Sequence, residues 1–257
     1  KAECSRQPSG KLSAEFGQNK DGYIRFKLTG KHGDKIKLTM GELIDGDGEL
    51  TLKNIQCATK RRATPLQRIE YTLKDGVNEY KTKFAVFGFQ YAQIECPDSV
   101  TLEELDAIAV YTDIKDTLYF DSSNELLNKF VSNTRWSTKN NSLDVPTDCP
   151  TRERHGWTGD AELFAKTALY LFDYAPFLKK YINDMKDGQK RNGCFRQISP
   201  RGGVDFYMNQ MDGSAGWSDA GVLIPYRVYE FTGDIDVLAR NYPAMKRYAL
   251  YKIGTIG

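Results

Sequence analysis

Histidine is scarce in this sequence, and no long apolar run occurs. Only His32 and His155 are present among 257 residues, and neither is suited to be the base of a Cys-His catalytic pair. No run of apolar residues approaches the length of a membrane span, and no signal-peptide pattern opens the chain. Since the first residue is Lys1 and not Met, we expect a processed or cut chain, and the sequence leaves its compartment unknown.

An excess of charge of one sign is also lacking. The chain holds 36 Lys and Arg against 34 Asp and Glu, a net charge of +2, and its basic residues are dispersed. A nucleic-acid or membrane partner is therefore not expected. The five cysteines are an odd number without a Cys-x-x-Cys pair, so at least one thiol is free and no structural zinc site is expected. No pattern calls for a metal, nucleotide or flavin cofactor.

What is present is a polar loop, 144–160, that carries many functional groups in a short span. Pro146 and Pro150 push the residues before them away from helical geometry, and Gly156 and Gly159 permit tight turns. The sequence therefore predicts a shaped loop rather than a helix or a strand. Its candidate site residues are Asp148, Arg152, Glu153, Trp157 and Asp160.

These side chains suit the hydrolysis of a glycosidic bond. One protonated carboxyl group gives its proton to the leaving oxygen, while an ionised one activates water or attacks. An indole offers an apolar wall to the C–H face of a sugar, and Arg and Asp side chains bind hydroxyl groups. The alternative is a solvated loop that ends in an ordinary helix cap at Thr158 or Asp160. Cys149 lacks a suitable basic partner, so we expect it to pack beneath the loop rather than to act as a nucleophile.

From about Ala14 to Thr112 the apolar residues alternate with period two. Strands are expected over 22–30, 35–40, 48–52, 67–73, 83–95 and 107–111, with Asp-Gly turns beginning at Asp21, Asp45, Asp47 and Asp75. Short alternating strands separated by such turns predict an antiparallel β-sandwich. Its aromatic residues are expected to belong to the core, with a role as sugar platforms as the alternative. The residues concerned are Tyr23, Tyr71, Phe87 and Tyr91.

After Asp121 the apolar spacing becomes helical. Ser122 and Glu125 form a capping box that opens a helix running to about Asn140. Further helices are expected over 161–172, 176–188, 222–231, 235–241 and 243–253. Pro225 predicts a kink or a later helix start. Helix pairs joined alternately by short turns and long polar loops indicate an (α/α) toroid whose long loops gather at one rim.

The polar stretch 189–217 is unusually long for a loop inside a compact domain, which is typical of a functional segment. It leads into Gly216-Trp-Ser-Asp-Ala220. From the residues alone this element predicts a simple helix start, with Ser218 as the N-cap and Asp219 in the first turn.

The string Asp148-Cys-Pro-Thr-Arg-Glu-Arg-His-Gly-Trp-Thr-Gly-Asp-Ala161 resembles the signature of bacterial α-L-rhamnosidases, glycoside hydrolase family 78. A looser resemblance covers the β-region, at Gly41-Glu42 and over 84–91. The resemblance implies that Glu153 is the general acid. Many members have Asp-Glu-Arg where this chain has Arg152-Glu153-Arg154, so Glu153 is the one acidic candidate there. The residues implied in rhamnose binding are Asp148, Arg152, Trp157 and Asp160, with Trp217 and Asp219 at the active-site rim.

The resemblance also implies the domain organisation. An antiparallel β-sandwich domain over 1–115 would precede part of an (α/α)6-barrel catalytic domain over 116–257, so the fold class is multi-domain α and β. A six-pair toroid needs about a dozen helices, and only about five or six are predicted here. We therefore expect a fragment that lacks the family's general base, a glutamate in the later half, and has little activity alone. Its uncovered helix faces are expected to favour self-association.

The implied function is the release of terminal α-L-rhamnose from rhamnosides with inversion at the anomeric carbon. One alternative is a non-catalytic protein that binds rhamnosides or other carbohydrates, which would show affinity without hydrolysis. Another is a different (α/α)-barrel hydrolase that acts on another sugar, which a substrate panel would reveal. The sequence leaves the aglycone and the preferred linkage open.

Overall fold

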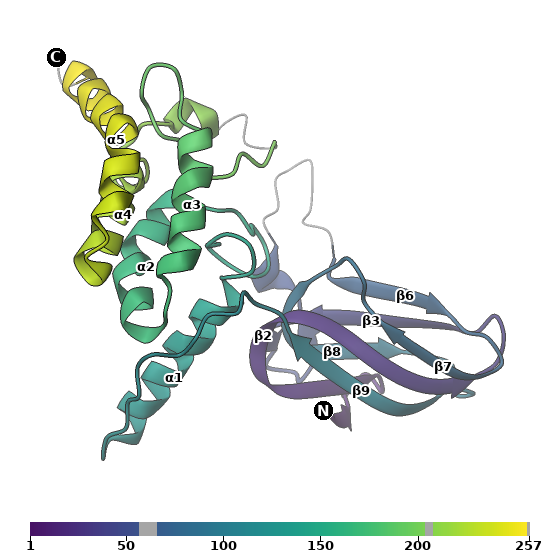
Figure 1. Ribbon diagram of the computed structural model, residues 1–257. Coiled ribbons are helices and arrows are strands. Elements are labelled where there is room, and N and C mark those ends of the chain that lie inside the picture. Colours follow the sequence, from purple (N-terminus) through teal and green to yellow (C-terminus); the bar gives the residue numbers. More distant parts are fainter. Residues whose placement is uncertain (57–65, 204–207, 256–257) are drawn as a thin grey trace. The chain divides into compact units, whose positions relative to one another are not determined.

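The chain forms two compact units, shown in Figure 1. The computed structural model describes residues 1–56, 66–203 and 208–255. The first unit consists of Lys1–Tyr111 with Cys149–Glu153, and the second of Thr112–Asp148 with Arg154–Gly257. A short piece of the polar loop thus belongs to the same unit as the strands.

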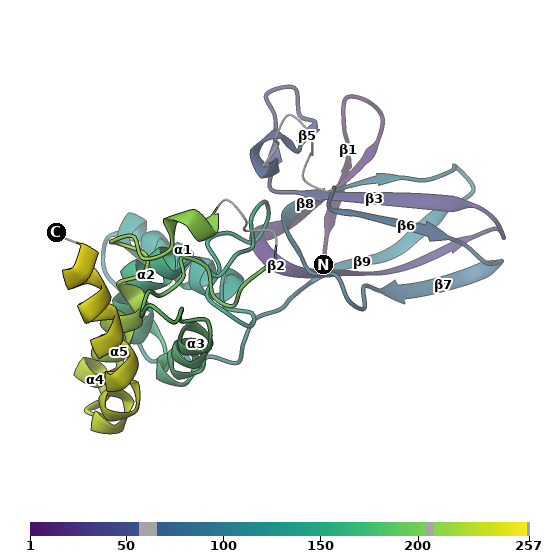
Figure 2. The same ribbon diagram turned by 90° about the horizontal axis from the view of Figure 1, so that it is seen from above.

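The first unit is an antiparallel β-sandwich, which confirms the fold expected from the alternating pattern. Its long strand β2 takes part in both layers (Figure 2). The first half of β2 pairs with β1 and β8, and the half after Gly22 pairs with β7 and β9. The strands are β1 (Glu3–Arg6), β2 (Leu12–Gly30), β3 (Lys35–Gly41), β4 (Leu43–Ile44), β5 (Leu50–Thr51), β6 (Arg68–Thr72), β7 (Gly76–Lys81), β8 (Phe87–Glu95) and β9 (Thr101–Ala109), with a 3-10 turn at Lys53–Ile55.

The core of the sandwich follows from the period-two pattern. Alternate residues of β2 are buried, at Ile24, Phe26 and Leu28, because successive side chains of a strand point to opposite faces. The ring of Phe26 lies 5.4 Å from that of Tyr71 on β6. Phe87 is also buried. Tyr71 and Phe87 therefore pack in or against the core, as expected, and are not exposed sugar platforms.

The Asp-Gly turns were predicted with mixed success. Asp45 does open a turn, since its Oδ1 accepts hydrogen bonds from the backbone of Asp47 and Glu49. The turn expected at Asp21 is wrong, because Asp21 and Gly22 lie inside β2. A Cβ at Gly22 would lie 2.0 Å from the carbonyl oxygen of Ile108 on β9. The glycine there permits close approach of a neighbouring strand and does not mark a chain reversal.

The second unit contains the helices expected for part of the toroid. They are α1 (Glu125–Asn140), α2 (Thr158–Leu171), α3 (Ala175–Asp187), α4 (Ala220–Thr232) and α5 (Ile235–Thr255), with a 3-10 turn at Met208–Met211. The side chain of Asn124 caps α1 by accepting from the backbone N–H groups of Leu126 and Leu127. The N-cap expected at Ser122 is therefore wrong. Its hydroxyl instead accepts from the Asn124 N–H.

Two prolines lie inside helices of this unit. Pro225 lies within α4, which begins before it at Ala220, so a later helix start is excluded. The two separate helices expected around Pro243 are one helix, α5. Its buried residues Val237, Ala244 and Tyr248 lie on both sides of the proline, so packing outweighs the one backbone hydrogen bond that Pro243 cannot donate.

Alanines on α2 let the helices of the second unit pack closely. Ala161, Ala165 and Ala168 are buried in one cluster with Tyr181 of α3 and Ile224 of α4. Small side chains at such a contact shorten the distance between helix axes. This packing fixes the position of the start of α2, where the polar loop ends.

Helix α1 exposes apolar side chains. Leu126 is 78% exposed, Leu127 49% and Phe130 67%. The helical spacing that predicted α1 was correct, but these residues do not face a core in this chain. Uncovered apolar residues of this kind were expected, and the self-association inferred from them stays a prediction.

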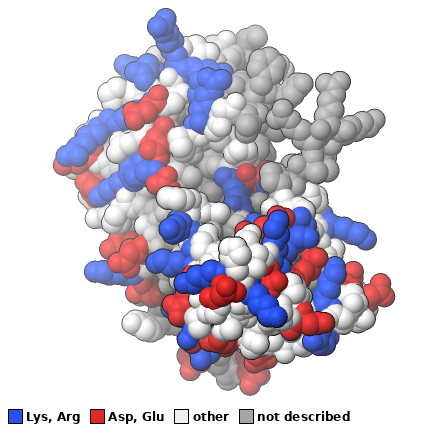
Figure 3. Space-filling view, turned by 90° about the vertical axis from the view of Figure 1, so that its right-hand side faces the viewer, with Lys and Arg blue, Asp and Glu red and all other residues white. Residues whose placement is uncertain are grey.

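The surface carries both signs of charge. On the face shown in Figure 3, Lys and Arg side chains are interspersed with Asp and Glu, in keeping with the small net charge of +2. Within the described ranges, no helix has both the length and the apolar character needed to cross a bilayer.

Candidate functional site

Asp148 closes the base of the polar loop. Its backbone N–H donates to the carbonyl oxygen of His155 at 3.1 Å, and the His155 N–H donates to its Oδ1 at 3.1 Å. The excursion from Cys149 to Arg154 therefore begins and ends at one point. Arg154 has φ of 54°, in the left-handed region that non-glycine residues seldom occupy. Such strain often accompanies a functional loop.

Glu153 lies near the end of this excursion, within the first unit. Its side chain is 30% exposed, and Oε1 lies 3.3 Å from Arg152 Nε. Its backbone N–H donates to the sulfur of Cys149 at 3.3 Å. Cys149 thus stabilises the turn that carries Glu153, which agrees with the structural role expected for this thiol.

The piece Cys149–Glu153 packs against β8 at Gly88. A Cβ at Gly88 would lie 2.6 Å from Thr151 Cγ2 and 2.7 Å from the carbonyl oxygen of Pro150. The buried side chain of Gln67 bonds both backbone groups of Gly88, by accepting from its N–H at 2.9 Å and donating to its oxygen at 2.7 Å. This contact was not predicted from the sequence. Its signal was a glycine inside an apolar strand, which often marks a close approach of another backbone.

In the second unit, the next residues of the loop pair with the polar stretch that follows α3. The Thr158 N–H donates to the oxygen of Gln197 at 2.8 Å, and the Ser199 N–H donates to the oxygen of Gly156 at 2.9 Å. A Cβ at Gly156 would lie 2.0 Å from the oxygen of Ser199. The Thr158 hydroxyl also donates to Gln197. Thr158 is therefore not a helix cap, and α2 begins without a side-chain cap.

Trp217 packs on the start of α2. A Cβ at Gly159 would lie 2.9 Å from its ring, so only glycine leaves room for the indole there. Trp217 is 40% exposed. Together with Trp157 it lines a groove of about 660 Å³ between the polar stretch and α5. The structure thus brings the two candidate tryptophans to one groove, although 59 residues separate them in the sequence.

Asp219 fixes the turn before α4. Its Oδ2 accepts from the Gly216 N–H at 2.8 Å, and its Oδ1 accepts from the Tyr248 hydroxyl at 2.6 Å. Burial, together with this hydrogen bond to Asp219, raises the pKa of Tyr248. The hydroxyl of Ser218 donates to Phe195 and accepts from Gly213. A helix does start here, as the residues alone predicted, but Ser218 is not its N-cap.

Asp148 and Asp160 line a second cavity of the same unit. It measures about 420 Å³ and lies between the end of α1 and the first turns of α2. Its apolar wall includes Phe164 and Leu178. Asp160 lies in the first turn of α2, where the helix dipole favours a negative charge. The two aspartates expected to bind one sugar therefore share a cavity.

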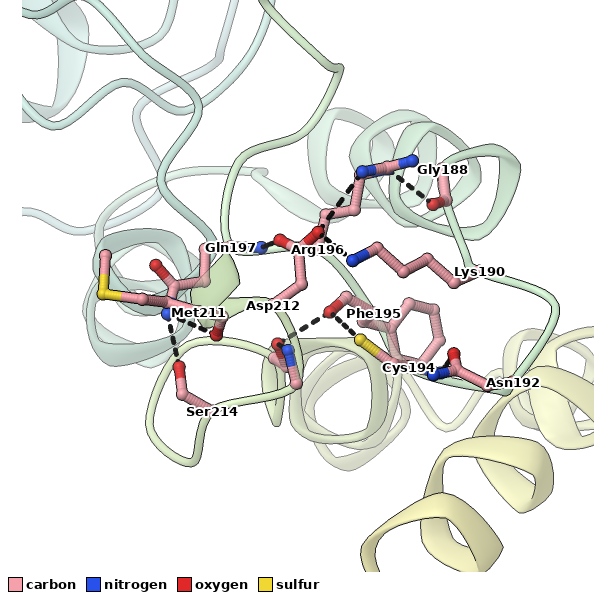
Figure 4. Close-up of polar contacts among 12 residues, drawn as sticks. Gly188, Lys190, Asn192, Cys194, Phe195, Arg196, Gln197, Met211, Asp212 and Ser214 are labelled. Atoms are coloured by element: carbon pink, nitrogen blue, oxygen red, sulfur yellow. Dashed lines mark hydrogen bonds and ion pairs between the residues drawn. The ribbon is translucent and has the colours of Figure 1, made fainter. Parts of the chain in front are cut away.

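A buried ion-pair cluster organises the polar stretch, as Figure 4 shows. The side chain of Asp212 is 3% exposed and lies 2.7 Å from Lys190 Nζ and 3.3 Å from Arg196 Nη1. Its other oxygen accepts from the Gln197 N–H at 3.0 Å. The sequence showed only a long polar segment here, because pairing among residues distant in sequence depends on the tertiary fold. Asp212 thus uses its carboxylate oxygens to bind two cations and the backbone of Gln197.

No metal site was found among residues 1–56, 66–203 and 208–255. No group of three or more His, Cys, Asp or Glu side chains in these ranges is arranged to hold an ion. The expectation that no cofactor is needed stays a prediction.

Comparisons with known proteins match both units. Residues 5–111 match the family model of the bacterial alpha-L-rhamnosidase concanavalin-like domain. Residues 115–255 match the bacterial alpha-L-rhamnosidase 6 hairpin glycosidase domain. An alpha-L-rhamnosidase of Streptomyces avermitilis is 35% identical over 245 residues, which cover 94% of this chain and 23% of that protein.

Solved structures agree with the sequence matches. That of alpha-L-rhamnosidase from Dictyoglumus thermophilum is 34% identical with a TM-score of 0.86, over 97% of this chain and 27% of that one. The Streptomyces avermitilis enzyme, solved in complex with L-rhamnose, is 33% identical with a TM-score of 0.82, over 96% of this chain and 23% of that one. The chain thus spans about a quarter of the length of these relatives.

Proposed function

Since this chain belongs to the bacterial α-L-rhamnosidase family, we propose that it carries the acid-bearing part of the active site of an inverting glycoside hydrolase. The substrate class is a rhamnoside with a terminal α-L-rhamnose. The observation that carries the proposal is the groove lined by Trp157 and Trp217. Trp157 follows Glu153, which is ion-paired with Arg152, by four residues in the same loop sequence. The boundary between the two domains near residue 115 is part of the same proposal.

Glu153 acts as the general acid. Its carboxyl proton passes to the glycosidic oxygen as the bond from that oxygen to the anomeric carbon breaks, and the aglycone leaves with the proton. A water molecule that has lost a proton to a separate base bonds to the anomeric carbon from the opposite face. Arg152, 3.3 Å from Glu153, stabilises the carboxylate that remains.

Other candidate residues contact the substrate from two separate cavities of the second unit, the tryptophans from the groove and the aspartates from the second cavity. Trp157 and Trp217 offer apolar walls to its C–H groups and its methyl group. Asp148 and Asp160 accept hydrogen bonds from hydroxyl groups. Asp219 does not contact the sugar directly. Both of its carboxylate oxygens accept hydrogen bonds from the protein, and they hold the turn that carries Trp217.

Among the described residues, neither Asp212 nor Asp219 can serve as the general base. Asp212 is ion-paired with Lys190 and Arg196, and Asp219 is bonded to Tyr248 and Gly216. Neither carboxylate is available to activate water. This supports a second candidate function for the chain taken alone, which is the binding of rhamnosides without turnover.

The test is the release of p-nitrophenol from p-nitrophenyl α-L-rhamnoside. Three proteins are compared: this chain, a longer product of the same gene that includes the later half of the barrel, and the longer product with Glu153→Gln. The longer product should work and this chain should not, while Glu153→Gln in the longer product should lower kcat without abolishing it, because nitrophenolate leaves readily without a proton. Glu125→Gln, at the exposed start of α1, is the matched control and should leave kcat unchanged.

Other results have definite meanings. Hydrolysis by this chain alone would place a base within it and contradict the missing-base account. Inactivity of the longer product on rhamnosides, with activity on another glycoside in a substrate panel, would show a different hydrolase. Affinity for methyl α-L-rhamnoside with no hydrolysis by either protein would establish the binding function instead.

A further inference from the structure

Gln197 presents an unused hydrogen-bond acceptor at the groove of the two tryptophans. The residue is 4% exposed and lines the groove. Its Nε2 donates to the carbonyl oxygen of Met211 at 2.8 Å and to the hydroxyl of Ser214. Because a carbonyl oxygen can only accept, the amide nitrogen must be the atom that faces Met211. Figure 4 shows the amide oxygen directed away from both partners.

The oxygen Oε1 of Gln197 is left for a ligand. No residue of the described part of the chain donates a hydrogen bond to it. Although the residue as a whole is nearly buried, this oxygen is not among the fully buried atoms that lack a partner, so it remains accessible to a donor. Because Gln197 lines the groove, a hydroxyl group of a ligand bound there can donate a hydrogen bond to this oxygen.

The backbone of Gln197 is held rigidly on two sides. Its N–H donates to Asp212, which Lys190 and Arg196 hold by ion pairs. Its oxygen accepts from the N–H and the hydroxyl of Thr158. The acceptor is therefore positioned before a ligand arrives, and little conformational entropy is lost on binding.

The remaining groups of the groove favour a neutral ligand with an apolar face. Trp157 and Trp217 supply flat apolar walls. The charged side chains at the groove are already bonded to the protein, Asp212 in its ion pairs and Lys252 through a hydrogen bond to the oxygen of Gly213. A pyranose combines C–H faces with hydroxyl donors, and it fits this chemistry better than an ionic ligand does.

We propose that this groove binds a neutral pyranose and that Oε1 of Gln197 accepts a hydrogen bond from one of its ring hydroxyl groups. The choice of rhamnose as the sugar rests on the proposed function. Gln197 is then a specificity-determining residue, because a sugar without a hydroxyl at that position gives this acceptor no donor.

The test measures binding, not hydrolysis, and uses the whole chain. Methyl α-L-rhamnopyranoside and its 2-, 3- and 4-deoxy analogues are titrated by calorimetry into the unaltered chain and into Gln197→Met. One deoxy analogue should bind about threefold to tenfold more weakly to the unaltered chain. The same analogue should lose no affinity relative to the parent sugar in the variant, because the partner of that hydroxyl is gone.

Gln197→Met also removes the hydrogen bonds that the side-chain amide donates to Met211 and Ser214, and their loss can perturb the folding of the variant. A second measurement therefore uses the unaltered chain alone. The side-chain carbonyl carbon of Gln197 is followed by NMR in the unaltered chain. Its chemical shift should change on saturation with the parent rhamnoside and should stay in place with the critical deoxy analogue. Ser214→Ala serves as the control, since it touches only the amide nitrogen and should keep the same order of affinities.

The inference is overturned if every deoxy analogue loses affinity equally in the unaltered chain and in Gln197→Met, or if the Gln197 carbonyl signal never moves. Methyl β-D-glucoside and methyl β-D-galactoside separate it from the proposed function. If one of these sugars binds and shifts the Gln197 carbonyl signal while the rhamnoside does not bind, the groove is a pyranose site but rhamnose is not its sugar. If the rhamnoside binds but neither the Gln197 signal nor the Gln197→Met variant responds to the sugar hydroxyl groups, the proposed sugar is supported and the role of Gln197 is contradicted.

Discussion

Single glycines decide where the polar loop can lie. Gly88 faces the backbone of the loop piece that contains Glu153, while Gly159 faces the ring of Trp217. Neither has a positive φ, so what these positions require is space and not a special backbone conformation. Their importance follows from the tertiary contact alone.

Gly88→Ala should therefore destabilise the first unit. A methyl group there meets the backbone of Pro150 and the side chain of Thr151, and overpacking of this kind costs about 1–3 kcal/mol. Chemical denaturation of the chain measures this loss. Gly46→Ala is the matched control, because nothing lies within 4 Å of a Cβ at that position. Equal stabilities of the two variants would show that the loop does not rest on Gly88.

At the scale of elements, the helix starts are controlled by polar side chains that the sequence identified only in part. Asn124→Ala should lower the free energy of unfolding by about 1 kcal/mol, since its side chain accepts from two N–H groups at the start of α1. Thermal and chemical unfolding measure the effect. Asn183→Ala, on the exposed face of α3, should change stability little. An unchanged stability of the Asn124 variant would contradict the cap.

The type of most elements could be predicted from the sequence, because burial of one face imposes a period of two on strands and a helical period on helices. The pattern gave the sandwich and α1 to α4. It failed at Gly22, where a long strand serves two layers, and at Pro243, where packing carries a helix past a proline. Both failures have a tertiary cause that local sequence does not contain.

The candidate site was predictable to a different degree. The loop residues were found because proline, glycine and charged groups cluster in sequence, and their proposed roles came from the family resemblance. Gln197 and Asp212 were not found as a functional pair. Their importance arises from bonds to Thr158, Lys190 and Arg196, and such pairings are set only when the chain has folded.

For the whole molecule, the uncovered apolar residues of α1 should make the chain self-associate. Leu126 and Phe130 lie four residues apart on one helix face and are 78% and 67% exposed. Light scattering of the purified chain should show species larger than a monomer, and the double variant Leu126→Glu, Phe130→Glu should reduce their share. Val77→Glu, at an exposed position on β7, is the control. A monodisperse monomer for the unaltered chain would contradict this prediction.

The central claim is that Glu153 supplies the proton for rhamnoside cleavage, and the measurement that tests it most directly is the dependence on the leaving group. In the longer gene product, Glu153→Gln is compared with the unmutated protein on p-nitrophenyl and methyl α-L-rhamnosides. Nitrophenolate leaves readily without a proton and methoxide does not, so the loss in kcat should be at least about tenfold greater for the methyl glycoside. An equal loss for both substrates would contradict the assignment of Glu153 as the general acid.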